Sequence, residues 1–219
     1  MGQHSDRVRA QLMDAAEELF ALHGIDAVSN RQIAERAGNA NHSAIAYHFG
    51  SRDDLIRALM ARHNAPMTER RRELLDELSA EPTVYDIVRC RLLPFIEVLD
   101  SLPRPSYRAQ FLIQLRSVPS ADAIIRDSVE SQALTRDIEA MFDRVDTVSR
   151  NVLRARSGIV GHLVLGVAAD FEARRNAGDE QGDWLDVGYF LIDAASGMLS
   201  APVTRPTDVS GFTENPRLV

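Results

Sequence analysis

The sequence contains no lysine, and all 25 of its basic side chains are arginines. A planar guanidinium suits the recognition of phosphates and bases better than an ammonium does. A bias in genomic base composition would also replace lysine by arginine, and this is the simpler explanation. The absence of lysine therefore assigns no function by itself.

Cysteine is almost absent, because Cys90 is alone in the chain. A single thiol excludes an internal disulfide, and no second thiol is present to share a metal. The first ten residues lack the apolar core of a signal peptide. The longest apolar run, residues 158–169, is too short to span a bilayer and contains His162. We therefore expect a cytoplasmic protein with no membrane partner.

Positive charge is also in deficit, with 25 basic against 32 acidic residues and a net charge of -7. This balance argues against a protein whose whole surface coats nucleic acid. The deficit is uneven, because residues 1–64 carry seven arginines and eight acidic residues. The first third of the chain is therefore nearly neutral. The chain has 219 residues, of which 45% are hydrophobic, enough to bury a core.

Long alternating β-branched runs and hairpin dipeptides are missing, whereas apolar residues recur at helical spacing, so the sequence predicts an all-α fold. The first helix is expected over residues 5–23. Ser29 and Gln32 form a capping-box pattern at the start of a second helix. A third short helix is predicted over residues 41–48, and Ser51 is expected to cap a fourth.

Longer helices follow, separated by proline and glycine. They are predicted over residues 66–79, 83–100, 104–117, 120–146, 149–177 and 183–201. Pro94 lies inside one of them and is expected to kink it. The predicted domain boundaries give two helical domains, over residues 1–50 and 51–201, and a disordered tail over 202–219.

Two short helices joined by a glycine-containing turn, with longer helices on either side, form a helix-turn-helix whose second helix fits the DNA major groove. The polar residues around this turn, Asn39, Asn41, His42 and Ser43, suit contacts to bases and phosphates. The alternative is a loop whose asparagines and serines only cap a helix.

The segments "AAEELFALHGIDAVSNRQIAERAG" and "YHFGSRDDL" together resemble the DNA-binding domain of the tetracycline-repressor (TetR) family. Shared features are a helix ending in Leu-Phe, a glycine turn, a serine cap, an Ile-Ala pair, Ala-Gly, an aromatic-His-Phe run and a basic residue before an acid and Leu. The stretch from Asn39 to Phe49 is one residue longer than is common, and Ala46 stands where an aromatic is frequent.

The resemblance implies that residues 1–50 form a DNA-binding domain and that residues 51–201 form an effector-binding and dimerisation domain. It also implies a set of DNA contacts. Ser29 and Arg31 would contact phosphate, Tyr47 and His48 would lie on the DNA backbone, and Arg52 would anchor the next helix. Asn41, His42, Ser43 and Ala44 are the candidates for base contact. A metal held by His42 and His48 is disfavoured, because a spacing of six places them poorly on one helix face. No metal or cofactor is expected.

The resemblance also implies a homodimer on a palindromic operator and an unidentified small-molecule effector. The dimer would form through the last two long helices, which are apolar and interleaved with glycine and alanine. Apolar and aromatic side chains with a few polar groups could line the effector pocket. The candidates are Phe95, Tyr107, Phe111, Gln114, Leu115, Met141, Phe142 and His162, although plain core packing is the commoner role for each of them.

The predicted function is a DNA-binding transcriptional regulator, most simply a ligand-responsive repressor. An enzyme is not expected, because the sequence has no glycine-rich phosphate loop after a strand and no His-Glu-x-x-His run. The alternative is a helical protein-interaction module or a small-molecule-binding protein without DNA binding.

Overall fold

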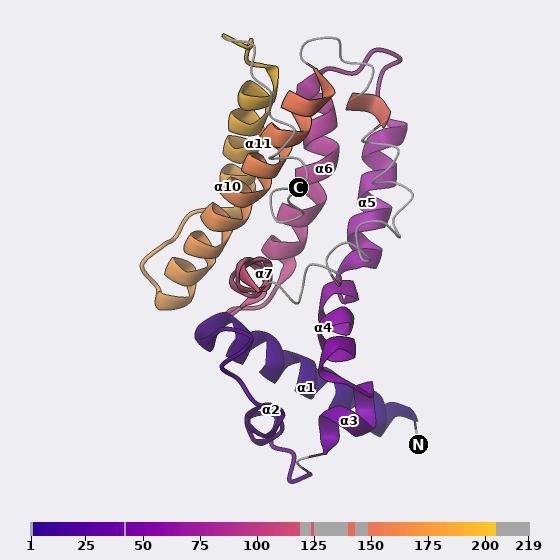
Figure 1. The fold of residues 1–219 in the computed structure, drawn as a ribbon, viewed down its shortest axis with the longest axis vertical. Coiled ribbons are helices and arrows are strands. Elements are labelled where there is room, and N and C mark those ends of the chain that lie inside the picture. Colours follow the sequence, from indigo (N-terminus) through magenta and orange to yellow (C-terminus); the bar gives the residue numbers. More distant parts are fainter. Residues whose placement is uncertain (1, 42, 119–123, 125–139, 143–148, 205–219) are drawn as a thin grey trace.

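The computed structural model describes residues 2–41, 43–118, 124, 140–142 and 149–204, and these residues form helices without strands (Figure 1). This confirms the predicted all-α class. The N-terminal helices are α1 (Gly2–His23), α2 (Asn30–Arg36), α3 (Ala44–Phe49) and α4 (Arg52–Ala61). They are followed by α5 (Asn64–Asp76), α6 (Val84–Ser101), α7 (Arg108–Ser117), α10 (Arg150–Ala177) and α11 (Trp184–Ser200).

The capping signals act where the sequence predicts them. The Ser29 hydroxyl accepts a hydrogen bond from the backbone N–H of Gln32, and the Gln32 side chain accepts one from the N–H of Ser29 at 2.8 Å. Ser51 caps α4 in the same way, since its hydroxyl accepts from the N–H of Asp54 at 3.1 Å. Gly50 ends α3 at a φ of 88°, a backbone conformation that favours glycine.

Two helices begin three or more residues later than predicted. Helix α3 starts at Ala44, because the side-chain oxygens of Asn39 and Asn41 accept the N–H groups of Asn41 and Ser43 at 2.8 and 3.0 Å. These local bonds hold the backbone in a turn and compete with the helix. Helix α7 starts at Arg108, since the prolines of the preceding loop disfavour helical geometry.

Other helix predictions have mixed outcomes. Helix α6 continues through the buried Pro94 from Val84 to Ser101. Most of the helix predicted over residues 120–146 lies outside the described residues, as does the tail from residue 205 onward.

The N-terminal helices share one buried apolar cluster. Its fully buried side chains include Leu12, Phe20, Ile33, Ile45, Leu55, Leu59 and Phe111. The Phe20 and Phe111 rings stack with their centroids 6.1 Å apart, which joins α1 to α7. The cluster therefore extends past residue 50 into α4 and α7. We call α1 to α4 the head and α5, α6, α10 and α11 the body.

The body has a second apolar cluster, in which α6 and α11 lie very close together. A β-carbon built on Gly188 of α11 would lie 2.6 Å from Cγ2 of Ile96 on α6, well inside van der Waals contact. Among the described helices, α10 alone is long and apolar enough to cross a membrane by length and composition. This helix also contacts α7 and α11 within the protein.

Candidate nucleic-acid interface

Helices α2 and α3 lie at the end of the molecule farthest from α11 (Figure 1). Each has a buried side and an exposed side. On α3, Ala44 and Ile45 are buried in the head, while Ala46 and Tyr47 are exposed. Tyr47 is 79% exposed, which is unusual for a large aromatic side chain. The exposed side of α3 therefore presents a ring and a hydroxyl that can donate to a phosphate.

Two neighbouring side chains brace the exposed end of α3. The His48 ring meets the Tyr47 ring edge to face, with centroids 4.9 Å apart. Arg9 of α1 donates to the backbone oxygen of His48, and its guanidinium lies 4.1 Å from the centroid of the Phe49 ring. Sequence reasoning missed Arg9, because its partners are about forty residues along the chain. Arg9 thus fixes α3 against α1.

Arg52 is an internal anchor of the head. Its guanidinium donates to the backbone oxygen of Ile25 and to Oδ1 of Asn30 at 3.1 Å, and it lies 4.8 Å from the Phe20 ring centroid. Burial lowers the pKa of Arg52 below the usual arginine value. The resemblance implies an anchoring role for Arg52, and these bonds suit that role. Its donors face the protein rather than the exposed side of α3.

Ser29 and Arg31 lie at the exposed start of α2. The Ser29 hydroxyl donates to Oε1 of Gln32 at 2.8 Å, so it is engaged in the capping box. Arg31 has 72% of its side chain exposed and pairs with Glu35 at 2.7 Å; the bond to Glu35 raises the pKa of Arg31. An exposed pair of this kind contributes little to stability, so Arg31 could exchange Glu35 for a phosphate at small cost.

The four candidates for base contact have different surroundings. Asn41 is exposed, and its side-chain oxygen is engaged by Ser43, which leaves its amide group as the donor. Ser43 is exposed and makes no capping hydrogen bond. Ala44 is only 1% exposed, so its methyl group faces the core of the head and cannot reach a base edge. His42 lies outside the described residues.

A hollow of about 630 Å³ lies beside α3. Its lining residues come from the start of α1 and from the turn and helix of α3: His4, Ser5, Val8, Asn39, Asn41, Tyr47 and His48. No pattern in the sequence indicated that His4 or Ser5 would belong to this surface. The first turn of α1 therefore contributes to the same surface as Tyr47.

The predicted effector residues fall into different parts of the structure. Phe111 and Leu115 are buried in the head cluster, and Tyr107 packs against it. Phe142, Phe95 and Met141 belong to the body cluster or pack against it. Gln114 is half-buried. His162 is exposed, with Nδ1 3.0 Å from the oxygen of Gly158 and 3.5 Å from Nη2 of Arg116. Of these eight candidates, Tyr107 lines a cavity that described residues form.

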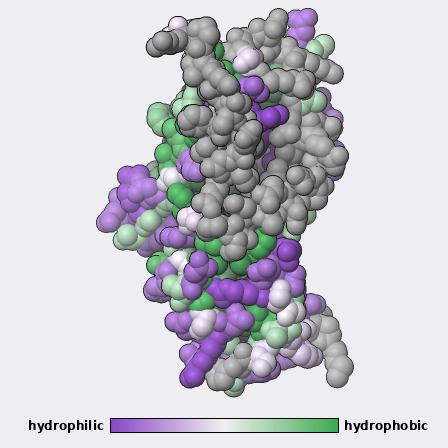
Figure 2. Space-filling view, in the orientation of Figure 1, coloured by the Kyte–Doolittle hydropathy of each residue, from purple (hydrophilic) through white to green (hydrophobic). Residues whose placement is uncertain are grey.

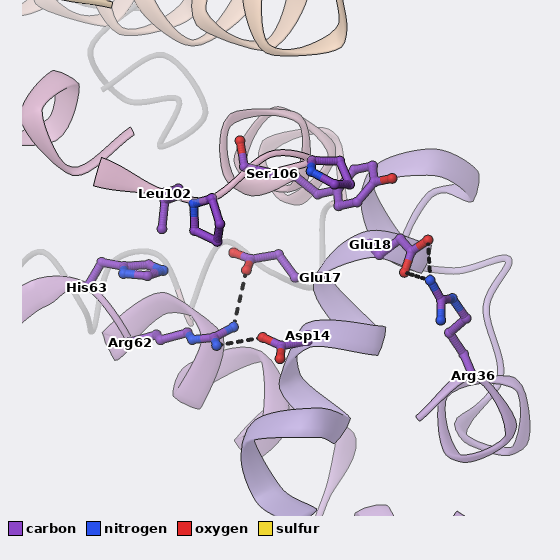
Figure 3. A pocket seen from close by; sticks show the side chains of 11 residues that line it. Asp14, Glu17, Glu18, Arg36, Arg62, His63, Leu102 and Ser106 are labelled. Carbon is purple, nitrogen blue, oxygen red and sulfur yellow. Dashed lines mark hydrogen bonds and ion pairs between the residues drawn. The ribbon is translucent and has the colours of Figure 1, made fainter. Parts of the chain in front are cut away.

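A separate cavity of about 440 Å³ lies between the head and the loop that leads into α7 (Figure 3). Its lining residues are Asp14, Glu17, Glu18, Arg36, Arg62, His63, Leu102, Pro103, Pro105, Ser106 and Tyr107. Arg62 pairs with Asp14 at 2.5 Å and with Glu17 at 3.5 Å, and Arg36 pairs with Glu18 at 2.7 Å. The charges that line this cavity are therefore already paired within the protein.

His63 is the one lining residue of this cavity with a strongly displaced pKa. Burial, with Arg108 and Arg62 nearby, lowers the pKa of His63 to about 4. Its Nε2 atom is buried and has no hydrogen-bond partner within the described part of the chain. The imidazole is therefore neutral at pH 7.

Residues 12–59 match the model of a family described as bacterial regulatory proteins, tetR family. This range covers α2 and α3, most of α4 and much of α1, and it ends beyond the predicted boundary at residue 50.

Two curated proteins show the same relationship. The HTH-type transcriptional repressor Rv3405c of Mycobacterium tuberculosis (strain ATCC 25618 / H37Rv) is 40% identical over 55 residues. The HTH-type transcriptional regulator Mb3439c of Mycobacterium bovis has the same identity over the same length. The matched stretch is 25% of this chain and 29% of each relative, so the chain matches less than a third of the length of either relative. The chain is therefore similar to the tetR family of bacterial regulatory proteins over residues 12–59.

Proposed function

We propose that this chain is a DNA-binding transcriptional regulator that binds a palindromic operator as a homodimer. The observation that carries the proposal is the helix-turn-helix of α2 and α3, with Tyr47 exposed beside the hollow at the end of the head. Arg31, Asn41, Ser43, Tyr47 and His48 are the described residues that we propose to contact DNA. Ser29 and Arg52 would support them by capping α2 and anchoring α4.

The overall charge of -7 is compatible with DNA binding because the contact surface is small. A helix in the major groove needs a few side chains at base edges and a few on phosphates, and the rest of the surface is free to be acidic. Most of the acidic excess lies beyond residue 64, away from α2 and α3. Salt ions at physiological concentration therefore screen the repulsion between the DNA phosphates and the acidic residues of the body.

The proposed dimer surface lies on α10 and α11. Figure 2 shows hydrophobic surface along the upper left edge of the molecule, where Figure 1 places these two helices. Large apolar side chains on them remain exposed, including Ile159 at 53%, Tyr189 at 42% and Phe190 at 66%. A second copy of the chain would cover such a patch. The proposed interface with a second copy also accounts for the apolar character of α10. We propose that the protein is located in the cytoplasm.

We also propose that a small-molecule effector controls DNA binding, as expected for a repressor of this kind. An effector bound among the central helices would favour a conformer whose two heads are wrongly spaced, and the operator would be released by linkage. A coupling of about 1 to 3 kcal/mol would weaken operator binding roughly tenfold or more. The effector's identity does not follow from the residues.

The dimer is tested by Phe190→Asp, which places a charge in the proposed interface. Leu22→Asp is the matched control, because Leu22 is also an exposed apolar residue, at 51%, but lies on α1. Sedimentation should show a monomer for Phe190→Asp and a dimer for the wild type and the control. Operator affinity should fall only for Phe190→Asp. Equal sedimentation of all three proteins would reject this interface.

A further inference from the structure

Arg108, the first residue of α7, is buried at 4% exposure between the head and the body. Its Nη1 donates to Oε1 of Glu17 on α1 at 3.2 Å and to the backbone oxygen of Leu59 at 2.7 Å. Its Nη2 donates to the backbone oxygen of Met60 at 3.2 Å. One guanidinium thus joins α7 to two helices of the head.

The bonds to Leu59 and Met60 fall on the last turn of α4. Carbonyl groups at a helix C-terminus have no partner within the helix, and a cation there also interacts favourably with the helix dipole. Arg108 therefore caps α4 from another element. Because Arg52 anchors the first turn of α4 to the head, both ends of this helix are held by arginines.

Helix α7 is held on its other side by the body. Glu172 of α10 is 1% exposed and accepts from Ser106 Oγ at 3.0 Å and from the N–H of Gln110 at 3.0 Å. The Asn176 side chain, one turn further along α10, bonds both the N–H and the oxygen of Ser106. A continuous set of polar contacts therefore runs from α10 through the start of α7 to α1 and α4.

These contacts constrain orientation more tightly than the apolar contacts between the same helices. The stacked rings of Phe20 and Phe111 can slide at small cost, because hydrophobic burial has little directional preference. Two hydrogen bonds from one planar guanidinium to successive carbonyls fix both distance and angle. The tilt of α4 relative to the body is accordingly set at Arg108.

The tilt of α4 decides where α3 lies, since only Gly50 and Ser51 separate the two helices. Ten helical residues span about 15 Å, so a tilt of about 10° at one end moves the other by about 2.6 Å. In a two-fold dimer the movements of both heads add to about 5 Å. That exceeds the rise of about 3.4 Å per base pair.

We propose that Arg108 is a positioning residue that sets the spacing between operator half-sites to which the dimer binds. It acts through α4 and does not touch DNA. The inference rests on the proposed dimeric DNA-binding function. Glu17 is its partner, and the burial of Glu17 in the same junction keeps the guanidinium in place.

The test compares the wild type with Arg108→Lys, which keeps the positive charge near Glu17 but cannot bond both carbonyls as a planar fork. Arg104→Lys is the matched control, because Arg104 is exposed in the loop just before α7. Operator duplexes with half-sites moved apart or together by one and two base pairs are titrated by anisotropy at one salt concentration. A duplex with a single half-site reports on the head alone.

The wild type and Arg104→Lys should prefer one spacing by tenfold or more over its neighbours. Arg108→Lys should flatten this preference to about threefold or less while its affinity for the single half-site is unchanged. An unaltered spacing profile in Arg108→Lys overturns the inference. A loss of affinity that is equal at every spacing also overturns it, because Arg108 would then act only on the stability of the head.

A measurement without DNA separates this inference from the proposed function. Ala40→Cys in the head and Ala173→Cys on α10, both exposed positions, carry spin labels for an intrachain distance measurement. Native Cys90 is buried and burial raises the pKa of its thiol, so it resists labelling. The distance distribution should broaden in Arg108→Lys. An unchanged distribution overturns the inference even if the chain binds no DNA at all.

Discussion

The close contact of α11 with α6 leads to a quantitative prediction for Gly188→Ala. Alanine is favoured over glycine in a helix by about 1 kcal/mol. Its methyl group would, however, lie 2.6 Å from Cγ2 and 3.1 Å from Cγ1 of Ile96, which is fully buried. Forcing an extra methyl group into a packed core costs about 1 to 3 kcal/mol. Gly188→Ala should therefore lower the free energy of unfolding by about 0 to 2 kcal/mol, the steric cost less the helix preference.

The same substitution in an Ile96→Ala background should have the opposite effect. Ile96→Ala alone costs about 2 to 5 kcal/mol and leaves space beside Gly188. The new methyl group then gains about 0.8 kcal/mol from burial in addition to the helix preference. Urea denaturation of the four proteins at one protein concentration gives the coupling between the sites, expected at about 2 to 4 kcal/mol. A stabilisation of about 1 kcal/mol in both backgrounds would refute the close contact.

Three further predictions concern the head and the junction. Ser29→Ala should lower the free energy of unfolding by about 1 kcal/mol through loss of the capping box. Ser43→Ala is the control and should be nearly neutral, because Ser43 makes no capping bond. Equal losses of stability for the two variants in denaturation would contradict this prediction. Tyr47→Ala should weaken operator binding about tenfold, which is equivalent to about 1.4 kcal/mol. The melting temperature should not change, since Tyr47 is 79% exposed. An unchanged operator affinity in anisotropy titrations would exclude Tyr47 from the interface. Burial holds the pKa of His63 at about 4 in the folded protein, below the unfolded value of 6.5. As the pH falls, the unfolded state therefore takes up the proton first, and the free energy of unfolding decreases from pH 7 to pH 5. In denaturation at each pH, His63→Gln should lose less stability over this range than the wild type.

The parts of the fold that could be predicted depend on short-range interactions. The capping box of Ser29 with Gln32 and the glycine that ends α3 involve residues within a few positions of each other, so the sequence alone indicates them. The late start of α3 is also local, but Asn39 and Asn41 can either cap a helix or form a turn. The sequence contains both possibilities, and the competition between them is decided by the surrounding packing.

The parts of the site that could not be predicted depend on contacts between distant residues. Arg9 reaches His48, and Arg108 reaches Glu17, Leu59 and Met60, across 39 to 91 positions. No local pattern distinguishes these arginines from the others in a chain whose basic residues are all arginine. Ala44 shows the same limitation, because its position in α3 suggested a base contact, whereas its methyl group is buried in the core of the head.

The most direct test of the proposed function is the capture of genomic DNA fragments from the source organism by the purified chain. The captured fragments are sequenced, and the best of them is titrated by anisotropy at several salt concentrations. We expect an enriched inverted repeat whose affinity falls steeply as salt rises, because each phosphate contact releases counterions. A folded protein that enriches no sequence at any salt concentration would contradict the assignment of this chain as a DNA-binding regulator.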